Sequence, residues 1–507
     1  MKKQNDPKSQ VWGGRMQSEP SMMNVYYCAG RDPFATPPAD DLLIPYDIWV
    51  NRVHCLMLLK QNIINKETAS EILFAIDKIA ELYRKGEFRI EKELEDVHIT
   101  IESKVAEISG EQAAGQMHTG RSRNDQTTTD CRLYVRDRLL EFYSRVITLV
   151  DSLLKTAGKH LRTVMPGFTH YQPAAVTSFG HFLASHAQAM LRDLTRIGMT
   201  YEQWNSSPLG AAAAFGTSWN IDRDYASGLL GFSHIQENSL DCISSRWEFE
   251  YQAASDLALF MNHLSVLGQD LILFSMAPRP MIKIDDAYVT GSSIMPQKRN
   301  PDFAEVTKAR AAACHGIVQT LLSLSKGAIS GYNRDAQWSK YAILDLFEEV
   351  RFAPLIFKGV ISTLQVNEKE MAERCRQNFI TSVDIADYIS QEKGLPFRSV
   401  YKMISETVGK CEEEGKLNLD IINKRLMQMG RHNAKLRKSE WVMLNAPGRL
   451  LERKKVAGGP APDSVKTNIN RLKQDLKTKK SWHSRKQKEL ENAHRLMRRE
   501  IDKILKK

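Results

Sequence analysis

Apolar residues recur along most of this chain at the three- and four-residue spacing typical of amphipathic helices. Residues 95–109 show the pattern clearly, because Val97, Ile101 and Val105 lie four positions apart. Two further periodic segments lie within 43–84. Longer ones follow at 127–162, 174–204, 246–276, 303–326 and 341–364. Strand-like alternation is scarce, so the pattern predicts a mainly α protein.

Five long helical segments in succession predict an antiparallel bundle whose loops lie at its two ends. Residues 251–275 carry leucines on more than one face, so this helix should be buried on several sides, by its own bundle or by other subunits. The length of 507 residues suits two or three domains. We place them at about 1–120, 121–375 and 376–474, followed by a tail at 475–507.

The composition is that of a globular protein, with 42% hydrophobic and 26% charged residues. The N-terminus lacks the apolar stretch of a secretory signal, and we find no apolar run that approaches a membrane helix of about 18 residues. Seven dispersed cysteines without a C-x-x-C pair favour reduced thiols in a cytoplasmic compartment. With no H-E-x-x-H motif and no cysteine cluster, we expect neither a metal nor an organic cofactor.

The net charge of +11 is concentrated at the C-terminus. From Arg471 to Lys507 the chain has fourteen Lys and Arg against five Asp and Glu, so this tail carries +9 and the rest of the chain +2. The tail could be a polar helix that packs weakly on its own oligomer, or a surface that binds RNA, DNA or another anionic partner. We favour packing, because basic tails are common and this one has a single aromatic residue, Trp482.

Residues 291–302 carry the most distinctive chemistry and read Gly-Ser-Ser-Ile-Met-Pro-Gln-Lys-Arg-Asn-Pro-Asp. Glycine and two prolines prevent a continuous helix, so the segment should be a loop. Ser292, Ser293, Lys298 and Asn300 offer hydroxyls, a cation and an amide. Such a loop suits one task, holding a carboxylate while a proton is removed from the adjacent carbon.

The helix that follows this loop strengthens the same interpretation. Pro301 and Asp302 fit a first helical turn, since proline needs no N–H there and aspartate favours the positive helix end. Asn300 would then lie near the N-cap, where free backbone N–H groups attract anions.

Two other loops have the same character. Arg121 and Arg123 flank Ser122 and Asn124 just before a helix that Asp125 opens, which would make an anion cradle. Taken alone, this segment is better explained as a capped helix start with solvent-exposed arginines.

In the other loop, Pro166-Gly167 marks a turn and Pro173 suits the first position of the next helix. Thr169 and His170 would therefore precede a positive helix end, which disfavours an imidazolium. A neutral His170 could take or relay a proton.

These loops resemble conserved segments of the fumarase/aspartase superfamily. Residues 291–301 resemble its signature GSSxMPxKxNP, and the Gln-Lys-Arg version resembles the argininosuccinate lyase branch. Residues 118–126 and 166–172 resemble that branch's first and second active-site loops, and Trp12-Gly13-Gly14-Arg15 its opening motif. The likeness covers roughly 11–470. It implies elimination of a group from the carbon next to a carboxylate-bearing carbon, usually with release of fumarate, in a homotetramer whose active sites are shared around a core of twenty helices.

The resemblance also implies catalytic roles. Ser292 would be the base that removes the proton, although the residues alone do not choose between Ser292 and Ser293. Lys298 would stabilise the resulting charge. His170, paired with Glu305, would transfer a proton to the leaving nitrogen.

Further positions are implied to bind the substrate. Glu95-Asp96-Val97-His98 resembles the family's Glu-Asp-Ile-His, and Tyr332, Gln337 and Lys340 keep the spacing of three substrate contacts. The predicted substrate-binding set is Arg31, Asp96, His98, Ser122, Arg123, Asn124, Thr169, Arg246, Asn300, Tyr332, Gln337 and Lys340.

Two departures from the branch concern the substrate. Arg31 follows Tyr-Cys-Ala-Gly where the branch has Asn-Ala-Ser, and the Ser-Asp-Arg-Asp around Arg246 is replaced by Ser-Ser-Arg-Trp-Glu. A cation at Arg31 would suit an additional carboxylate better than a guanidinium. The sequence therefore predicts a C–N lyase that releases fumarate from an N-substituted aspartate, most simply argininosuccinate. Another aminocarboxylate substrate, a non-catalytic lyase-fold protein and a nucleic-acid-binding protein are the alternatives.

Overall fold

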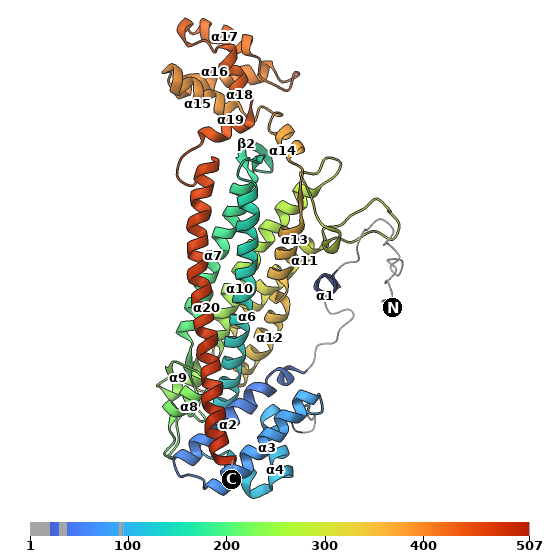
Figure 1. The fold of residues 1–507 in the computed structure, drawn as a ribbon. Coiled ribbons are helices and arrows are strands. Elements are labelled where there is room, and N and C mark those ends of the chain that lie inside the picture. The colour runs from blue at the N-terminus through green and yellow to red at the C-terminus, as the bar shows by residue number, and fades with distance from the viewer. Residues whose placement is uncertain (1–20, 30–37, 91–93, 95, 506–507) are drawn as a thin grey trace.

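The computed structural model describes residues 21–29, 38–90, 94 and 96–505. Long antiparallel helices form a bundle, with small groups of helices at its two ends (Figure 1). The long helices are α6 (Arg123–Lys159), α7 (Phe179–Gln203), α10 (Arg246–Ser275), α11 (Asp302–Leu324) and α20 (Pro462–Leu505). The predicted mainly α fold is confirmed.

One end of the bundle carries α2 (Ile44–Lys60), α3 (Lys66–Lys85), α4 (Val97–Ser109), α5 (Glu111–Met117), α8 (Arg223–Leu229) and α9 (Ser239–Ser244). The other end carries α14 (Glu368–Arg374), α15 (Ser382–Lys393), α16 (Phe397–Lys410), α17 (Leu419–Gln428), α18 (Lys438–Leu444) and α19 (Pro447–Arg453). Helix α1 (Met22–Ala29) packs against α11.

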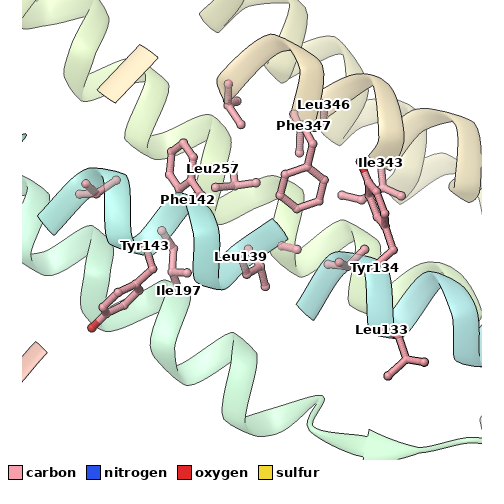
Figure 2. Packing of buried hydrophobic residues seen from close by; sticks show 14 of the residues in the cluster. Leu133, Tyr134, Leu139, Phe142, Tyr143, Ile197, Leu257, Ile343, Leu346 and Phe347 are labelled. Atoms are coloured by element: carbon pink, nitrogen blue, oxygen red, sulfur yellow. The ribbon is translucent and has the colours of Figure 1, made fainter. Parts of the chain in front are cut away.

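A single large hydrophobic core joins the bundle to α2–α5. Within it, Phe142 of α6 meets Phe260 of α10 edge-on, with ring centroids 5.0 Å apart, and Figure 2 shows Leu139, Ile197 and Leu257 converging on the same region. A second, smaller core lies among α15–α18. The domain boundaries at 120, 375 and 474 stay predictions.

Helix α10 is buried on several sides, as its sequence indicates, by α11, α7, α12 and α6. Our statement that no apolar run approaches membrane length was wrong for this helix, because an 18-residue window of α10 reaches a mean hydropathy of 1.4. Half of that window is buried inside the bundle. The apolar character of α10 therefore belongs to the core of the bundle.

The segment 341–364, predicted as one helix, consists of two. Helix α12 (Trp338–Val350) ends before Arg351, and α13 (Ala353–Thr363) begins with Pro354 in its first turn. Proline lacks the N–H that a continuous helix would need at this position, so a new helix starts there.

The strands are short. The longest pair, β1 (Val164–Thr169) and β2 (Gln172–Ser178), forms an antiparallel hairpin. The others are β3 (Ser206–Ser207) with β4 (His234–Ile235), and β5 (Ile282–Lys283) with β6 (Gln365–Val366).

This hairpin contradicts the predicted surroundings of His170. His170 and Tyr171 occupy its two-residue turn with φ of 52° and 60°, as the primed turns of tight hairpins require. Pro173 lies inside β2, and α7 begins only at Phe179. A proline is tolerated in a strand at a sheet edge, which every strand of a two-stranded sheet is. The proposed helix dipole next to His170 is therefore wrong.

Helix α20 runs along the outside of α6 and α7. With 44 residues it is about 66 Å long, so it spans most of the bundle in Figure 1. Trp482 packs against Tyr143 of α6 and Tyr201 of α7, with centroid separations of 4.8 and 5.4 Å. Residues 475–505 of the basic tail thus form most of a helix that packs on its own chain.

Candidate active site

Nine of the predicted substrate-binding residues line one cavity of about 570 Å³. They come from four separate segments of the chain, and they are Asp96, His98, Ser122, Arg123, Asn124, Arg246, Tyr332, Gln337 and Lys340. The fold therefore assembles residues that are far apart in sequence.

Four helices begin at this cavity. Asp96 is the N-cap of α4, and its carboxylate accepts the Ile99 N–H at 2.9 Å. Ser122 is the N-cap of α6. Arg246 is the first residue of α10, and Gln337 is the N-cap of α12. Since helix N-termini carry partial positive charge and free N–H groups, their convergence favours an anionic ligand.

The Ser122 position is fixed by a capping box. Ser122 Oγ accepts the Asn124 N–H at 3.2 Å, and the Ser122 N–H donates to Asp125 Oδ1 at 2.9 Å. The other oxygen of Asp125 accepts the N–H groups of Gly210 and Ala212 at 2.8 and 2.9 Å. Asp125 therefore joins the start of α6 to the loop before α8.

Positive charge dominates the described lining. The cationic side chains are Arg121, Arg123, Arg246, Arg334 and Lys340, and the carboxylates are Asp40 and Asp96. Both carboxylates already have a cation, because Asp40 pairs with Lys340 and Asp96 pairs with Arg123 at 3.0 Å. The cavity is thus suited to a ligand with several negative charges.

Burial changes the charge of two groups near the cavity. It lowers the pKa of His118 to about 4, an effect that Arg121 reinforces, so His118 is neutral at pH 7. It raises the pKa of Glu250 to about 7 although Arg246 and Arg132 oppose the change. Glu250, one helical turn from Arg246, is therefore only partly ionised at pH 7 and neutralises the Arg246 charge only in part.

The remaining described site residues lie at the opposite end of the bundle. Helix α6 starts at Arg123 and runs for 37 residues, about 55 Å, before the hairpin that carries Thr169 and His170. Helix α10 starts at Arg246 and ends about 45 Å away at Ser275, and the chain then passes through β5 before it reaches the loop with Ser292. The Phe168 and Phe274 rings, with centroids 6.0 Å apart, bring the hairpin next to the end of α10 (Figure 1).

The signature loop has a defined internal structure. Backbone hydrogen bonds between Thr290 and Asn300 close it, and Asn300 Nδ2 donates to the Gly291 carbonyl at 3.1 Å. Ser292 Oγ accepts the Met295 N–H at 3.1 Å, whereas Ser293 is exposed.

Lys298 is exposed and lies shortly before Asn300, the residue that closes this loop. Helix α11 begins at Asp302 with Pro301 as N-cap, one residue later than predicted. Asn300 therefore precedes the N-cap and closes the loop.

Glu305 is exposed in the first turns of α11, and within the described part of the chain no hydrogen bond joins it to His170. Their pairing stays a prediction. Arg31, Glu95 and the opening motif 12–15 lie outside the described residues.

Sequence reasoning omitted five described residues of the cavity wall that carry polar side chains, namely Asp40, His118, Thr127, Arg334 and Tyr341. It named Arg121 as part of the anion cradle but left this residue out of the substrate-binding set. Arg121 and His118 belong to the motif at 118–126, so the motif itself was the available signal. Asp40 gives no such signal, because the residues next to it in the sequence do not distinguish it from other aspartates.

One group of side chains has the composition of a metal site. Possible ligand atoms of Asp47, His98 and Asp130 lie within 4.8 Å of one another. Asp47 already accepts hydrogen bonds on both oxygens, and Arg121 is a nearby positive charge. The group is better described as a buried hydrogen-bond network. The expectation that no cofactor is needed stays a prediction.

Comparison with known proteins agrees with this geometry. Residues 36–316 match the Lyase family, and residues 379–438 match the argininosuccinate lyase C-terminal family. Argininosuccinate lyase of Desulforamulus reducens is 33% identical over 468 residues, covering 92% of this chain and 99% of that protein. The enzyme of Pelotomaculum thermopropionicum is 35% identical over 469 residues, with the same coverage of both chains.

Solved structures give the same picture. EDDS lyase in complex with formate superposes with a TM-score of 0.85 at 26% identity, covering 96% of each chain. Class II fumarase from Schistosoma mansoni, at 15% identity and a TM-score of 0.69, covers 87% of this chain and 96% of its own, and it shares the fold. The chain belongs to the argininosuccinate lyase branch of the fumarase/aspartase superfamily. It is therefore a C–N lyase.

Proposed function

We propose that this enzyme releases fumarate from an N-substituted aspartate by β-elimination, with argininosuccinate as the first candidate substrate. The observation that carries the proposal is the convergence of nine predicted substrate contacts on one cation-rich cavity. The identity to argininosuccinate lyases supports the choice of first candidate. With that substrate the enzyme would act in arginine synthesis, and the dispersed cysteines without a C-x-x-C pair favour the cytoplasm as its compartment.

The difficult step is removal of a proton beside a carboxylate, because the carbanion becomes a dianion on the carboxylate oxygens. Fixed donors and cations stabilise that second charge. In our proposal Lys298 and Asn300 do so, and Ser292 is the base. The N–H of Met295 donates to Ser292 Oγ, which would stabilise the alkoxide form of this serine.

His170, supported by Glu305, then protonates the leaving nitrogen. The turn of the hairpin leaves His170 exposed, so its imidazole is free to face a substrate bound by another chain.

We further propose that the active site is shared among subunits of a homotetramer. A substrate held by Arg123 cannot reach Ser292 of the same chain, because the length of α10 separates the two ends of the bundle. Exposed apolar side chains on α10 and α11, among them Leu259, Val266 and Leu322, support burial of these helices against other copies.

One observation favours a second candidate, an aminocarboxylate substrate with no guanidinium. The two described carboxylates of the cavity wall are both paired with cations, so neither is free to receive a substrate cation. The similarity to EDDS lyase, which was also solved as a variant with bound fumarate, supports this alternative.

Ultraviolet detection of fumarate tests the proposal. The purified enzyme is given argininosuccinate and a panel of N-substituted aspartates with carboxylate-bearing substituents, with Ser292→Ala as the inactive control. Release from argininosuccinate supports the first candidate, and release only from the carboxylate-rich compounds supports the second. If the wild type releases nothing from any member, the catalytic proposal is wrong and the non-catalytic alternative gains.

A further inference from the structure

Behind the cavity wall lies a buried pair of carboxyl groups that the proposed reaction does not use. Asp47 of α2 and Asp130 of α6 are both fully inaccessible to solvent. Between them and the cavity lies His98 of α4, which is 5% exposed and lines the cavity.

Asp47 has the contacts of an ionised carboxylate. Its Oδ1 accepts Gln126 Nε2 and contacts His98 Nδ1, each at 2.9 Å, and its Oδ2 accepts Asn51 Nδ2 at 2.8 Å. Burial alone would raise the pKa of Asp47, but His98, Arg121 and Gln126 outweigh burial and lower it. Because a carboxylate only accepts, the proton between Asp47 and His98 must be on Nδ1.

Among the described residues, Asp130, in contrast to Asp47, lacks the donors that an ionised carboxylate needs. Within the described part of the chain, neither of its oxygens receives a hydrogen bond from a donor, and Oδ2 lies 3.8 Å from His98 Nδ1. An ionised carboxylate in such a place would be a buried charge without donors, which is strongly unfavourable. A protonated carboxyl is neutral, and its O–H can donate to the neighbouring Asp47.

The surrounding charges agree with this assignment. Burial and the adjacent Asp47 raise the pKa of Asp130 well above its usual range, whereas Arg121 opposes the change. The other ionisable groups that face the cluster are Asp40, Glu102, His118 and the buried Cys131. Of these, His118 is neutral at pH 7.

We propose that Asp47 and Asp130 share one proton, carried by Asp130, and that this pair holds His98 with Nδ1–H toward Asp47 and Nε2 toward the cavity. His98 Nε2 then meets Thr127 Oγ1, at 2.7 Å, on the cavity side. Asp47 and Asp130 are positioning residues, since neither lines the cavity. The effect on turnover rests on the proposed function, whereas the location of the proton does not.

The test compares Asp130→Asn with Asp47→Asn. Asparagine at 130 is neutral and can donate to Asp47 as the carboxyl does, so it should fold normally. In the wild type, Asp130 keeps its proton in the folded state but is ionised in the unfolded state. The free energy of unfolding of the wild type therefore falls as pH rises above the usual carboxyl range. Asp130→Asn should therefore have a higher Tm than the wild type at pH 8, with the gap closing toward pH 4.

Asp47→Asn should behave in the opposite way. Its amide cannot accept three donors, so this variant should have a lower Tm than the wild type at pH 8, and the gap should narrow as acid protonates Asp47 in the wild type. Selective ¹⁵N NMR of His98 should show Nδ1 protonated in the wild type and in Asp130→Asn, and the Nδ1 proton lost or shared in Asp47→Asn.

Turnover gives the functional readout. Asp130→Leu, which cannot donate, should lower kcat/KM by about tenfold, and Asp130→Asn should restore it to within about threefold of the wild type. Asp47→Asn should lower kcat/KM by about 10²-fold, mostly through KM. An Asp130→Asn variant that is less stable than the wild type at pH 8 would show that Asp130 is ionised and overturn the inference. Absence of any lyase activity would overturn the proposed function alone, because the Tm and NMR results do not depend on turnover.

Discussion

Lys340 donates to the carboxylate of Asp40 in the wall of the cavity, although the two residues lie 300 positions apart in the sequence. Their side chains are only 8% and 12% exposed. Burial would lower the pKa of Lys340, but Asp40 more than compensates and raises it, so the ammonium stays charged. The pair fixes the start of α12 to the turn before α2 and neutralises one of the two carboxylates in the wall.

Asp40→Asn should therefore cost stability. It leaves the Lys340 charge largely buried without its partner, and the expected loss in the free energy of unfolding is about 3 kcal/mol, measured by urea denaturation. The double variant Asp40→Asn/Lys340→Met should regain much of the stability because no unpaired charge remains. An equal loss in the free energy of unfolding in both variants would show that the unpaired Lys340 charge is not the cause of the loss.

Ser292→Ala should lower kcat by at least about 10²-fold with little change in KM, on the scale of general acid–base groups. Ser293→Ala is the matched control and should retain most of the activity, since Ser293 is exposed and Ser292 Oγ receives the backbone N–H. The opposite ranking of the two variants in the fumarate assay would move the base to Ser293.

Glu250 should make the enzyme sensitive to pH. Its folded pKa of about 7 lies above the ordinary value of 4.5, so its contribution to stability is fully present below pH 4.5 and is lost as pH rises through 7. Glu250→Gln should have a higher Tm than the wild type at pH 8 and a similar Tm at pH 4.

The same titration should affect substrate binding. Ionised Glu250 partly neutralises Arg246, so KM of the wild type should rise above pH 7, and Glu250→Gln should remove this rise. If KM depends on pH in the same way in the wild type and in Glu250→Gln, the titration of Glu250 does not affect substrate binding.

Helix α20 should be a stabilising element. Trp482→Ala removes contacts with Tyr143 and Tyr201, and because Trp482 is half-buried the expected loss is about 2 kcal/mol, below the range for a fully buried tryptophan. Arg499→Ala, on an exposed position of the same helix, is the control and should be neutral. Binding of polynucleotide that weakens with salt and disappears in Arg499→Ala would instead support the nucleic-acid alternative.

The sequence predicted α6, α7, α10 and α11 to within a few residues because each must present an apolar face to the bundle, and that requirement leaves a regular spacing. The start of α20 at Pro462 was missed, because the predicted tail began only at 475. The hairpin at 164–178 was missed because its strands are short and contain prolines, which we assigned to a turn and a helix start. Separation of α12 from α13 was missed because the apolar spacing continues across the break at Arg351.

The site could be predicted only where chemistry leaves a motif. The loops containing Ser122 and Ser292 have such motifs. The distance between these two loops follows from the lengths of the helices between them, which the sequence predicts. Which loop of one chain meets which loop of another depends on how the subunits assemble. Asp40, Asp47 and Asp130 are single carboxylates, and only the fold shows that they meet Lys340 and His98.

The shared active site is tested most directly by mixing two inactive variants, Arg123→Ala at the cavity and Ser292→Ala at the other end of the bundle. After dissociation and reassembly, some sites should combine an intact cavity from one chain with an intact signature loop from another, so fumarate release should return. If native mass spectrometry shows mixed oligomers and no activity returns, the two sets of residues do not form one site, and the account is contradicted.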